Sequence, residues 1–376
     1  MSKSVALLLV LVFLTASCTG VIKPVWVSAV VIEDSWVSKA PMQVARGGLG
    51  VAVVNGKIYA IGGSTGSGSD ALISGIVGTN EEYDPETDTW TFKVSMPTPR
   101  TSFAIAAYQN KIYCIGGNTG YSSDTGYACT GVNEVYDPAT DTWETKASMP
   151  TARSSVQAYV VNGKIYLIGG APNGILNEVY DPAANTWETK TPMPTEAGGY
   201  ASAVVDNKIY IFWYTLNHIY DPATDSWSQG ASPPRGILGA AGATTGALAP
   251  KRIYVITAPG NIAPGPQPPC YTQVYDPANR DWATAANITT NRSYFGVAVV
   301  NDKLYAIGGD IFDFFGFGTP SAVNEQYTPI GYGTPDSTDQ SQSPLLIYAV
   351  AATAAAITII AITAVALKKR QQKNTN

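Results

Sequence analysis

The stretch "NEVYDPATDTW" at residues 133–143 returns almost unchanged as "NEEYDPETDTW" at 80–90 and "NEVYDPAANTW" at 177–187. Proline fixes φ for a turn and aspartate accepts backbone N–H groups two residues on, so Asp-Pro predicts a hairpin of two short strands. Five complete copies place a tyrosine and a tryptophan seven residues apart: Tyr83 and Trp90, Tyr136 and Trp143, Tyr180 and Trp187, Tyr220 and Trp227, Tyr275 and Trp282. This fixed interval predicts that the rings fill the space between neighbouring units as packing residues.

The tryptophans recur every 40 to 55 residues, a period typical of propellers and solenoids. Ahead of each hairpin stands a small or β-branched run and then a segment such as "KIYAIGG" (57–63), "KIYCIGG" (111–117) or "KLYAIGG" (303–309). The alternating apolar positions predict four short antiparallel strands per unit. The paired glycines, the tyrosine and the tryptophan resemble the kelch repeat over residues 34–329. The resemblance implies an all-β, six-bladed kelch β-propeller over residues 21–330.

The two ends of the repeat region complement each other. The sixth unit ends in "NEQYTP" (324–329) without a tryptophan, whereas Trp36 stands unpaired at the front of the chain. We therefore expect an N-terminal strand to complete the last blade. Such closure removes the exposed edge that an open sheet would offer to other chains.

The loops after the paired glycines vary most and predict a binding face. They are long in units five, six, one and two, which are consecutive in a closed ring, so we expect a raised rim there. "DIFDFFGFG" (310–318) supplies Phe312, Phe314, Phe315 and Phe317. The other long loops supply Tyr121, Tyr127 and Tyr271, and the fourth unit has Phe212 and Trp213 in place of the glycines. Aromatic loop residues favour recognition, although the phenylalanine-rich loop could instead fold back into the central channel.

Arginines precede the innermost strands and are expected near the mouth of the central channel. They are Arg46, Arg100, Arg153, Arg235 and Arg292, with Ala197 at the corresponding position of unit four. Five guanidiniums could hold a carboxylate or phosphate ligand. The alternative is that they pair with neighbouring backbone groups or acids.

Several classes of catalysis are excluded by composition. The chain has a single histidine, His218, which rules out the copper site of galactose-oxidase-like kelch enzymes, a histidine-rich zinc site and a histidine-dependent triad. We predict no metal and no cofactor. A sialic-acid mutarotase-like or lyase-like enzyme needs only arginine and carboxylate groups, such as Glu196, Asp310 and Asp313, and remains the alternative.

The terminal segments predict a membrane-anchored surface protein. Residues 1–20 have the pattern of a signal peptide, with lipidation of Cys18 as an alternative. Residues 345–367 are 23 uncharged residues, long enough for a transmembrane helix, and are followed by a basic tail at 368–376. Cations stay on the cytoplasmic side, so the propeller is expected outside, on a flexible stalk at 331–344.

Charge and cysteine content limit the partners. Without Lys3 and the four cations of the tail, 18 basic residues face 28 acidic ones, a net charge of about −10, which argues against nucleic acid. Cys114 and Cys129 flank one loop, and a disulfide between them is one possibility in an oxidising exterior. The sequence thus predicts a surface module that binds a protein or a glycan through loops on one face.

Overall fold

The computed structural model describes residues 31–67, 74–124, 126–237, 239–257, 269–312 and 318–334. The described residues from Ile32 onward belong to one compact unit. Every regular element in the described ranges is a β-strand. These ranges contain no helix that is long and apolar enough to cross a membrane, and the segments predicted as signal peptide (1–20) and membrane helix (345–367) lie outside them.

Six four-stranded antiparallel sheets follow one another along the chain. Blade one comprises β2 (Gly50–Val54), β3 (Lys57–Ile61), β4 (Asn80–Asp84) and β5 (Thr89–Lys93). Blade two comprises β6 (Ala104–Tyr108), β7 (Lys111–Ile115), β8 (Asn133–Asp137) and β9 (Thr142–Lys146). Blade three comprises β10 (Gln157–Val161), β11 (Lys164–Ile168), β12 (Asn177–Asp181) and β13 (Thr186–Thr189).

The second half of the ring continues the same order. Blade four comprises β14 (Ala201–Val205), β15 (Lys208–Trp213), β16 (Leu216–Asp221) and β17 (Ser226–Gln229). Blade five comprises β18 (Ala241–Thr244), β19 (Ile253–Thr257), β20 (Tyr271–Asp276) and β21 (Asp281–Ala285). Blade six comprises β22 (Gly296–Val300), β23 (Lys303–Ile307), β26 (Asn324–Thr328) and β1 (Ser35–Lys39). A short hairpin of β24 (Asp310–Phe312) and β25 (Gly318–Pro320) is inserted in blade six.

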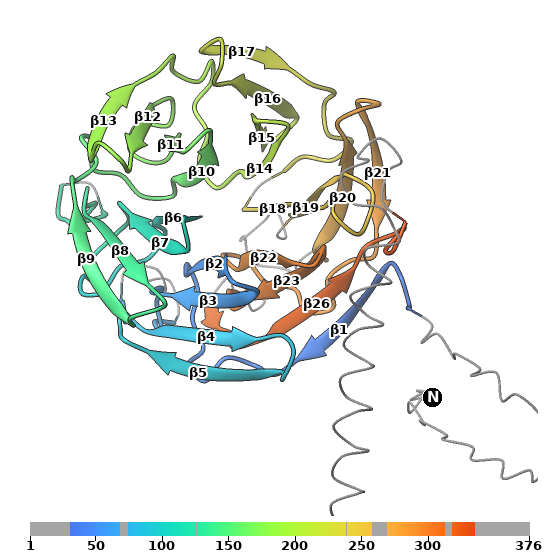
Figure 1. The fold of residues 1–376 in the computed structure, drawn as a ribbon, viewed down its shortest axis with the longest axis horizontal. Helices are drawn as coiled ribbons and strands as arrows, with labels where there is room; N and C mark the ends of the chain where they lie inside the picture. The colour runs from blue at the N-terminus through green and yellow to red at the C-terminus, as the bar shows by residue number, and fades with distance from the viewer. Residues whose placement is uncertain are drawn as a thin grey trace, which may run out of the picture. The chain divides into compact units, whose positions relative to one another are not determined.

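Blade six confirms the predicted closure of the ring. The first strand, β1, pairs antiparallel with β26, and Trp36 lies opposite Tyr327 in the register that Tyr–Trp pairs have in the other blades. In Figure 1 the two ends of the described chain meet side by side in this sheet. The all-β, six-bladed propeller expected from the sequence is therefore the fold of the described residues.

The repeated hairpin also connects each blade to the one before it. Tyr83 lies opposite Trp90 with ring centroids 4.9 Å apart, and its hydroxyl donates to Asp88 Oδ1 at 2.6 Å. The same carboxylate accepts the backbone N–H of Ala40 from blade six, and Trp90 Nε1 donates to the Ala40 carbonyl. Trp143 Nε1 likewise donates to Val94 of the preceding blade. The tyrosines are fully buried, whereas the tryptophans are partly exposed on the outer strands, so the pair both packs and links blades.

The core is divided among the six interfaces between blades. Each of the six buried apolar clusters contains residues of two neighbouring blades. In blade one, for example, Ile58 packs toward blade six and Ile61 toward blade two. Successive residues of a strand point to opposite faces of the sheet, so one strand serves both interfaces.

The face opposite the long loops holds the end of the described chain. The turn between β18 and β19 is widened, and the Asp302 carboxylate accepts the backbone N–H groups of residues 246–249. Gly333 N donates to Leu248 O at 2.6 Å in this widened turn. Turns between first and second strands lie opposite the loops between second and third strands, because the strands alternate in direction. The last described residues therefore lie at the face opposite the predicted binding loops.

Candidate functional site

Four of the five predicted arginines lie inside the blades rather than at the channel mouth. Arg46, Arg100, Arg153 and Arg292 are each 0% exposed. Arg46 pairs with Glu81 at 2.6 Å and Arg100 pairs with Glu134 at 2.7 Å. The two remaining pairs are Arg153 with Glu178 and Arg292 with Glu325. Each glutamate belongs to the "NE" pair that starts the third strand of the same blade.

Backbone carbonyls complete these buried sites. Arg100 donates to Cys114 O at 2.8 Å and Arg46 donates to Ala60 O at 3.0 Å, both on the second strand of their blades. Burial lowers the pKa of the Arg46 and Arg292 guanidiniums, and the partner glutamates oppose that shift. A buried charge is tolerated only when it is paired and hydrogen-bonded. The expected orientation toward the channel therefore does not hold for these four residues, because their partners lie within the blade.

Blade four has lost both members of this pair. Ala197 stands at the position of the arginine, and His218 at the position of the glutamate. His218 is 3% exposed, neither ring nitrogen has a hydrogen-bond partner, and desolvation lowers its pKa. The imidazole is thus held in its neutral form inside the blade.

Blade five has lost the pair in a different way. Tyr214 N donates to Ile237 O at 2.7 Å, as Gly63 N donates to Arg100 O at 3.0 Å between blades one and two. Ile237, fully buried, therefore takes the place of the arginine, and Gln273 takes that of the glutamate. Arg235 lies two residues before Ile237 and its side chain is exposed. Of the five predicted arginines, only Arg235 reaches the surface.

The predicted loop aromatics differ in their exposure. Tyr121 and Tyr127 are 68% and 50% exposed, while Phe312, Tyr271 and Trp213 are partly buried. Two further tyrosines on this face, Tyr214 and Tyr294, are 50% and 39% exposed. Tyr214 follows Trp213 in the substituted segment of unit four, whereas nothing in the sequence analysis pointed to Tyr294. Tyr294 has φ of 56°, at a position where blades one, two and three have Gly48, Ser102 and Ser155. Phe314, Phe315 and Phe317 lie outside the described residues.

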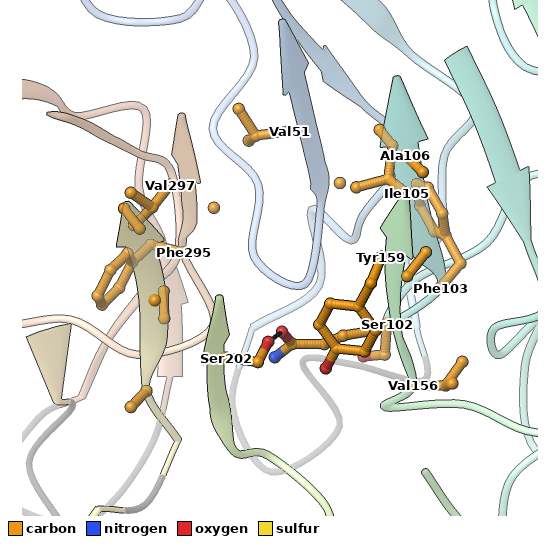
Figure 2. Close-up of a pocket in the computed structure, with 18 of the residues that line it drawn as sticks. Val51, Ser102, Phe103, Ile105, Ala106, Val156, Tyr159, Ser202, Phe295 and Val297 are labelled. Atoms are coloured by element: carbon orange, nitrogen blue, oxygen red, sulfur yellow. Dashed lines mark hydrogen bonds between the residues drawn. The ribbon is translucent and has the colours of Figure 1, made fainter. Parts of the chain in front are cut away.

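A cavity of about 500 Å³ runs between the innermost strands. Its described lining residues carry no charge at neutral pH and are mostly glycine, alanine, valine and phenylalanine. Polar groups gather where blades three and four meet: Gln157 Nε2 donates to Tyr200 O at 2.6 Å, and Ser202 donates to Gln157 Oε1. Figure 2 shows Ser202 and Tyr159 on one side of this cavity and Phe295 and Val297 on the other. Tyr159 stands where the other five inner strands have alanine.

Of the three acids considered for catalysis, the two that the structure describes do not converge on this cavity. Glu196 is exposed, and Asp313 lies outside the described residues. Asp310 is 1% exposed, and neither of its carboxylate oxygens has a hydrogen-bond partner among the described residues. Desolvation raises the pKa of Asp310 to about 7. Neither Glu196 nor Asp310 lines the cavity.

The cysteines of the described residues are unbridged. Cys114, Cys129 and Cys270 are free thiols, so the possible disulfide between Cys114 and Cys129 is absent from this structure. Burial raises the pKa of Cys114 to about 12, which keeps its thiol protonated. No group of three or more His, Cys, Asp or Glu side chains within the described ranges is arranged to hold a metal ion.

Comparisons with known proteins place this architecture in a family. The KLHDC2/KLHL20/DRC7 Kelch-repeats domain matches residues 35–213, and the Kelch motif matches residues 291–331. The chain belongs to the kelch-repeat family. The interval between the two matches, 214–290, contains the two outer strands of blade four and all four strands of blade five, the blades in which the buried pairs are missing.

Individual kelch relatives match only part of the chain. Beta-scruin of Limulus polyphemus is 31% identical over 36% of this chain and 14% of its own length. The influenza virus NS1A-binding protein homolog of Mus musculus is 44% identical over 23% of this chain and 12% of its own length. Human kelch repeat and BTB domain-containing protein 12 is 30% identical over 37% of this chain. The alignment covers 24% of that protein, so this chain spans at most about a quarter of these three relatives.

A solved structure of YjhT shares the fold. Its TM-score is 0.58 at 16% sequence identity, and the match covers 75% of this chain and 95% of YjhT. At this identity the similarity concerns the kelch propeller architecture alone.

Proposed function

We propose that this kelch propeller binds a protein partner through the face that carries the long loops. The observation that carries the proposal is the exposure of Tyr121, Tyr127, Tyr214 and Tyr294 on that face, whereas the tyrosines of the repeated hairpin are buried. Exposed tyrosines on loops held by a rigid scaffold are typical of recognition surfaces. One relative is named for binding the influenza virus NS1A protein, which agrees with a binding role.

Binding fits the site better than the enzyme alternative. A mutarotase-like or lyase-like reaction on a sugar acid needs guanidinium and carboxylate groups next to the substrate. Four arginines are sealed in ion pairs, and the described lining of the cavity is neutral. We therefore propose a protein partner, and binding to a glycan is one of the outcomes that the test below can show.

The test is a binding screen of the full-length chain against surface proteins and glycans. Tyr121→Ala combined with Tyr127→Ala is expected to weaken a genuine protein hit at least about 10-fold, since buried interface tyrosines commonly contribute 2 kcal/mol or more. Phe92→Ala is the matched control, because Phe92 is 53% exposed on the outer strand β5. Equal loss in both variants, or hits confined to glycans, would contradict the proposal.

We also propose that the loop face is directed away from a cell membrane. The support is the position of Gly333, which hydrogen-bonds to Leu248 on the opposite face. Gly333 lies at the start of the predicted stalk at 331–344, which precedes the predicted helix at 345–367. A tag placed after residue 376 is expected to be reached by antibody only in permeabilised cells. Staining of that tag on intact cells would contradict this topology.

A further inference from the structure

Arg235 is fixed in place without using its own charge. Its backbone N–H donates to Gln273 Oε1 at 2.9 Å, and Gln273 Nε2 donates back to its carbonyl at 3.2 Å. The guanidinium carbon lies 5.2 Å from the centre of the Tyr271 ring. That ring is held in turn, because the Tyr271 hydroxyl donates to Gly236 O. The backbone and side chain of Arg235 and the ring of Tyr271 are therefore in position before any ligand binds.

The guanidinium itself is available. Within the described residues it forms no ion pair, in contrast to Arg46, Arg100, Arg153 and Arg292. A guanidinium stacked on an aromatic face keeps its planar N–H edge free for a carboxylate. Because Arg235 is already exposed and immobilised, binding an anion costs little desolvation of a buried charge and little side-chain entropy.

The turn that carries Arg235 also contacts an exposed aromatic residue. Tyr214, half exposed, pairs through its backbone with Ile237, and its ring lies 4.8 Å from that of Trp213. Gly236, next to Arg235 in the chain, has free space where a side chain would otherwise project. The ring of Tyr214 and this free space suit an acidic residue with a bulky apolar neighbour. A sugar acid would instead need several hydrogen-bonding side chains around its hydroxyl groups.

We propose that Arg235, supported by Tyr271, is a subsite for an acidic side chain of the protein partner, located on blades four and five. This inference rests on the proposed protein-binding function and specifies where and how one contact is made. It places the charged contact at the blade-five end of the predicted rim over blades five, six, one and two. The shortest loop after a second strand, that of blade four, lies next to this end.

The experiment is a thermodynamic cycle on the full-length chain with two dye-labelled probes, acetyl-Phe-Glu-Phe amide and acetyl-Phe-Gln-Phe amide. Fluorescence anisotropy gives the dissociation constants. We expect Arg235→Ala to weaken the Glu peptide about 10- to 100-fold, because hydrogen bonds to charged groups contribute that much. Arg235→Lys should restore only part of the affinity, since lysine lacks the planar fork. The Gln peptide should bind the wild-type protein weakly, with about the same dissociation constant as the Glu peptide has for Arg235→Ala.

Arg280→Ala is the matched control. Arg280 is also exposed, but it lies in the Asp-Pro turn on the opposite face and donates to Gln229 O. Equal affinity for the two peptides, no effect of Arg235→Ala, or no Glu-peptide binding at millimolar concentration would each overturn the subsite. Full competition by N-acetylneuraminic acid without peptide binding would do the same and favour a glycan. If protein hits lose affinity in the Tyr121 and Tyr127 variant but not in Arg235→Ala, the binding function stands and this inference fails.

Discussion

Blades six, one, two and three differ from blades four and five in how the turn before each blade is attached to its third strand. The first group uses a fully buried arginine–glutamate pair, as in Arg100 with Glu134. In the second group the two positions hold Ala197 with His218 and Ile237 with Gln273. Both members of the pair are replaced together in both blades. The arginine of this repeat is therefore a structural partner of the glutamate. Where the pair is lost in blade five, Gln273 still holds the turn through its backbone, and the arginine side chain is not needed for this contact.

Breaking one pair should have the largest effect. Glu134→Gln leaves the Arg100 guanidinium buried without its counter-charge, which typically costs about 3–5 kcal/mol of the free energy of unfolding. Arg100→Met combined with Glu134→Gln should recover part of this loss, because no buried charge remains. His218→Gln in blade four is the control and should change stability by less than about 1 kcal/mol, since His218 has no hydrogen-bond partner among the described residues to lose. Urea denaturation gives the free energy of unfolding of all three variants. Equal destabilisation by Glu134→Gln and His218→Gln would contradict the distinction between paired and unpaired blades.

The sequence predicted the blades and their closure well because that information is local. The Asp-Pro turn, the Tyr–Trp interval and the unpaired Trp36 each specify a strand pairing with little reference to the rest of the chain. The alternative that the arginines pair with backbone groups or acids is confirmed for four of them. The partners themselves were not predicted, because each glutamate lies 25 to 35 residues further along. The sequence did contain a pattern that indicates these pairs. Units with the arginine also have the "NE" glutamate, and the two units that lack one also lack the other.

Other features of the site had weaker signals. Arg235 looked equivalent to the other arginines because it follows prolines, and only the backbone pairing of Ile237 reveals the two-residue offset. Tyr294 occupies a left-handed position that glycine or serine fills elsewhere, so its exposure depends on the ring as a whole. The burial of Asp310 likewise depends on Gly47 of the next blade, where a side chain would collide with the carboxylate.

Asp310 differs from the buried glutamates of the regular blades, because it is a buried acid that is not paired with an arginine. Its pKa in the folded chain is about 7, compared with about 3.9 in an unfolded chain. The folded state thus binds more protons between these values, and the free energy of unfolding should fall as pH rises from 4 to 7 and then level off. The total is at most about 4 kcal/mol. Asp310→Asn should remove this slope, and parallel urea-derived stability curves for the two proteins would argue against it.

Installing the missing pair in blade four should have a smaller effect. Ala197→Arg alone buries an unpaired guanidinium and should destabilise the chain, as should His218→Glu alone. The double variant should be more stable than the sum of the two single changes predicts, with a coupling energy of about 1–3 kcal/mol. Thermal and urea unfolding of the four proteins give this value. Strict additivity would mean that blade four cannot accommodate the pair that blade three forms between Arg153 and Glu178.

The smallest expected effect concerns Arg235, which is exposed and unlike the four buried arginines of the regular blades. Arg235→Ala removes an exposed side chain with a single ring contact and no ion pair, so stability should change by no more than about 0.5 kcal/mol. Arg100→Ala removes the same residue type from an equivalent turn and should cost several times more, because Glu134 is then buried alone. Urea denaturation of the two variants side by side makes the comparison direct. A large loss in Arg235→Ala would show that this residue also holds its blade together, and blade five would then keep an arginine for the same reason as the regular blades.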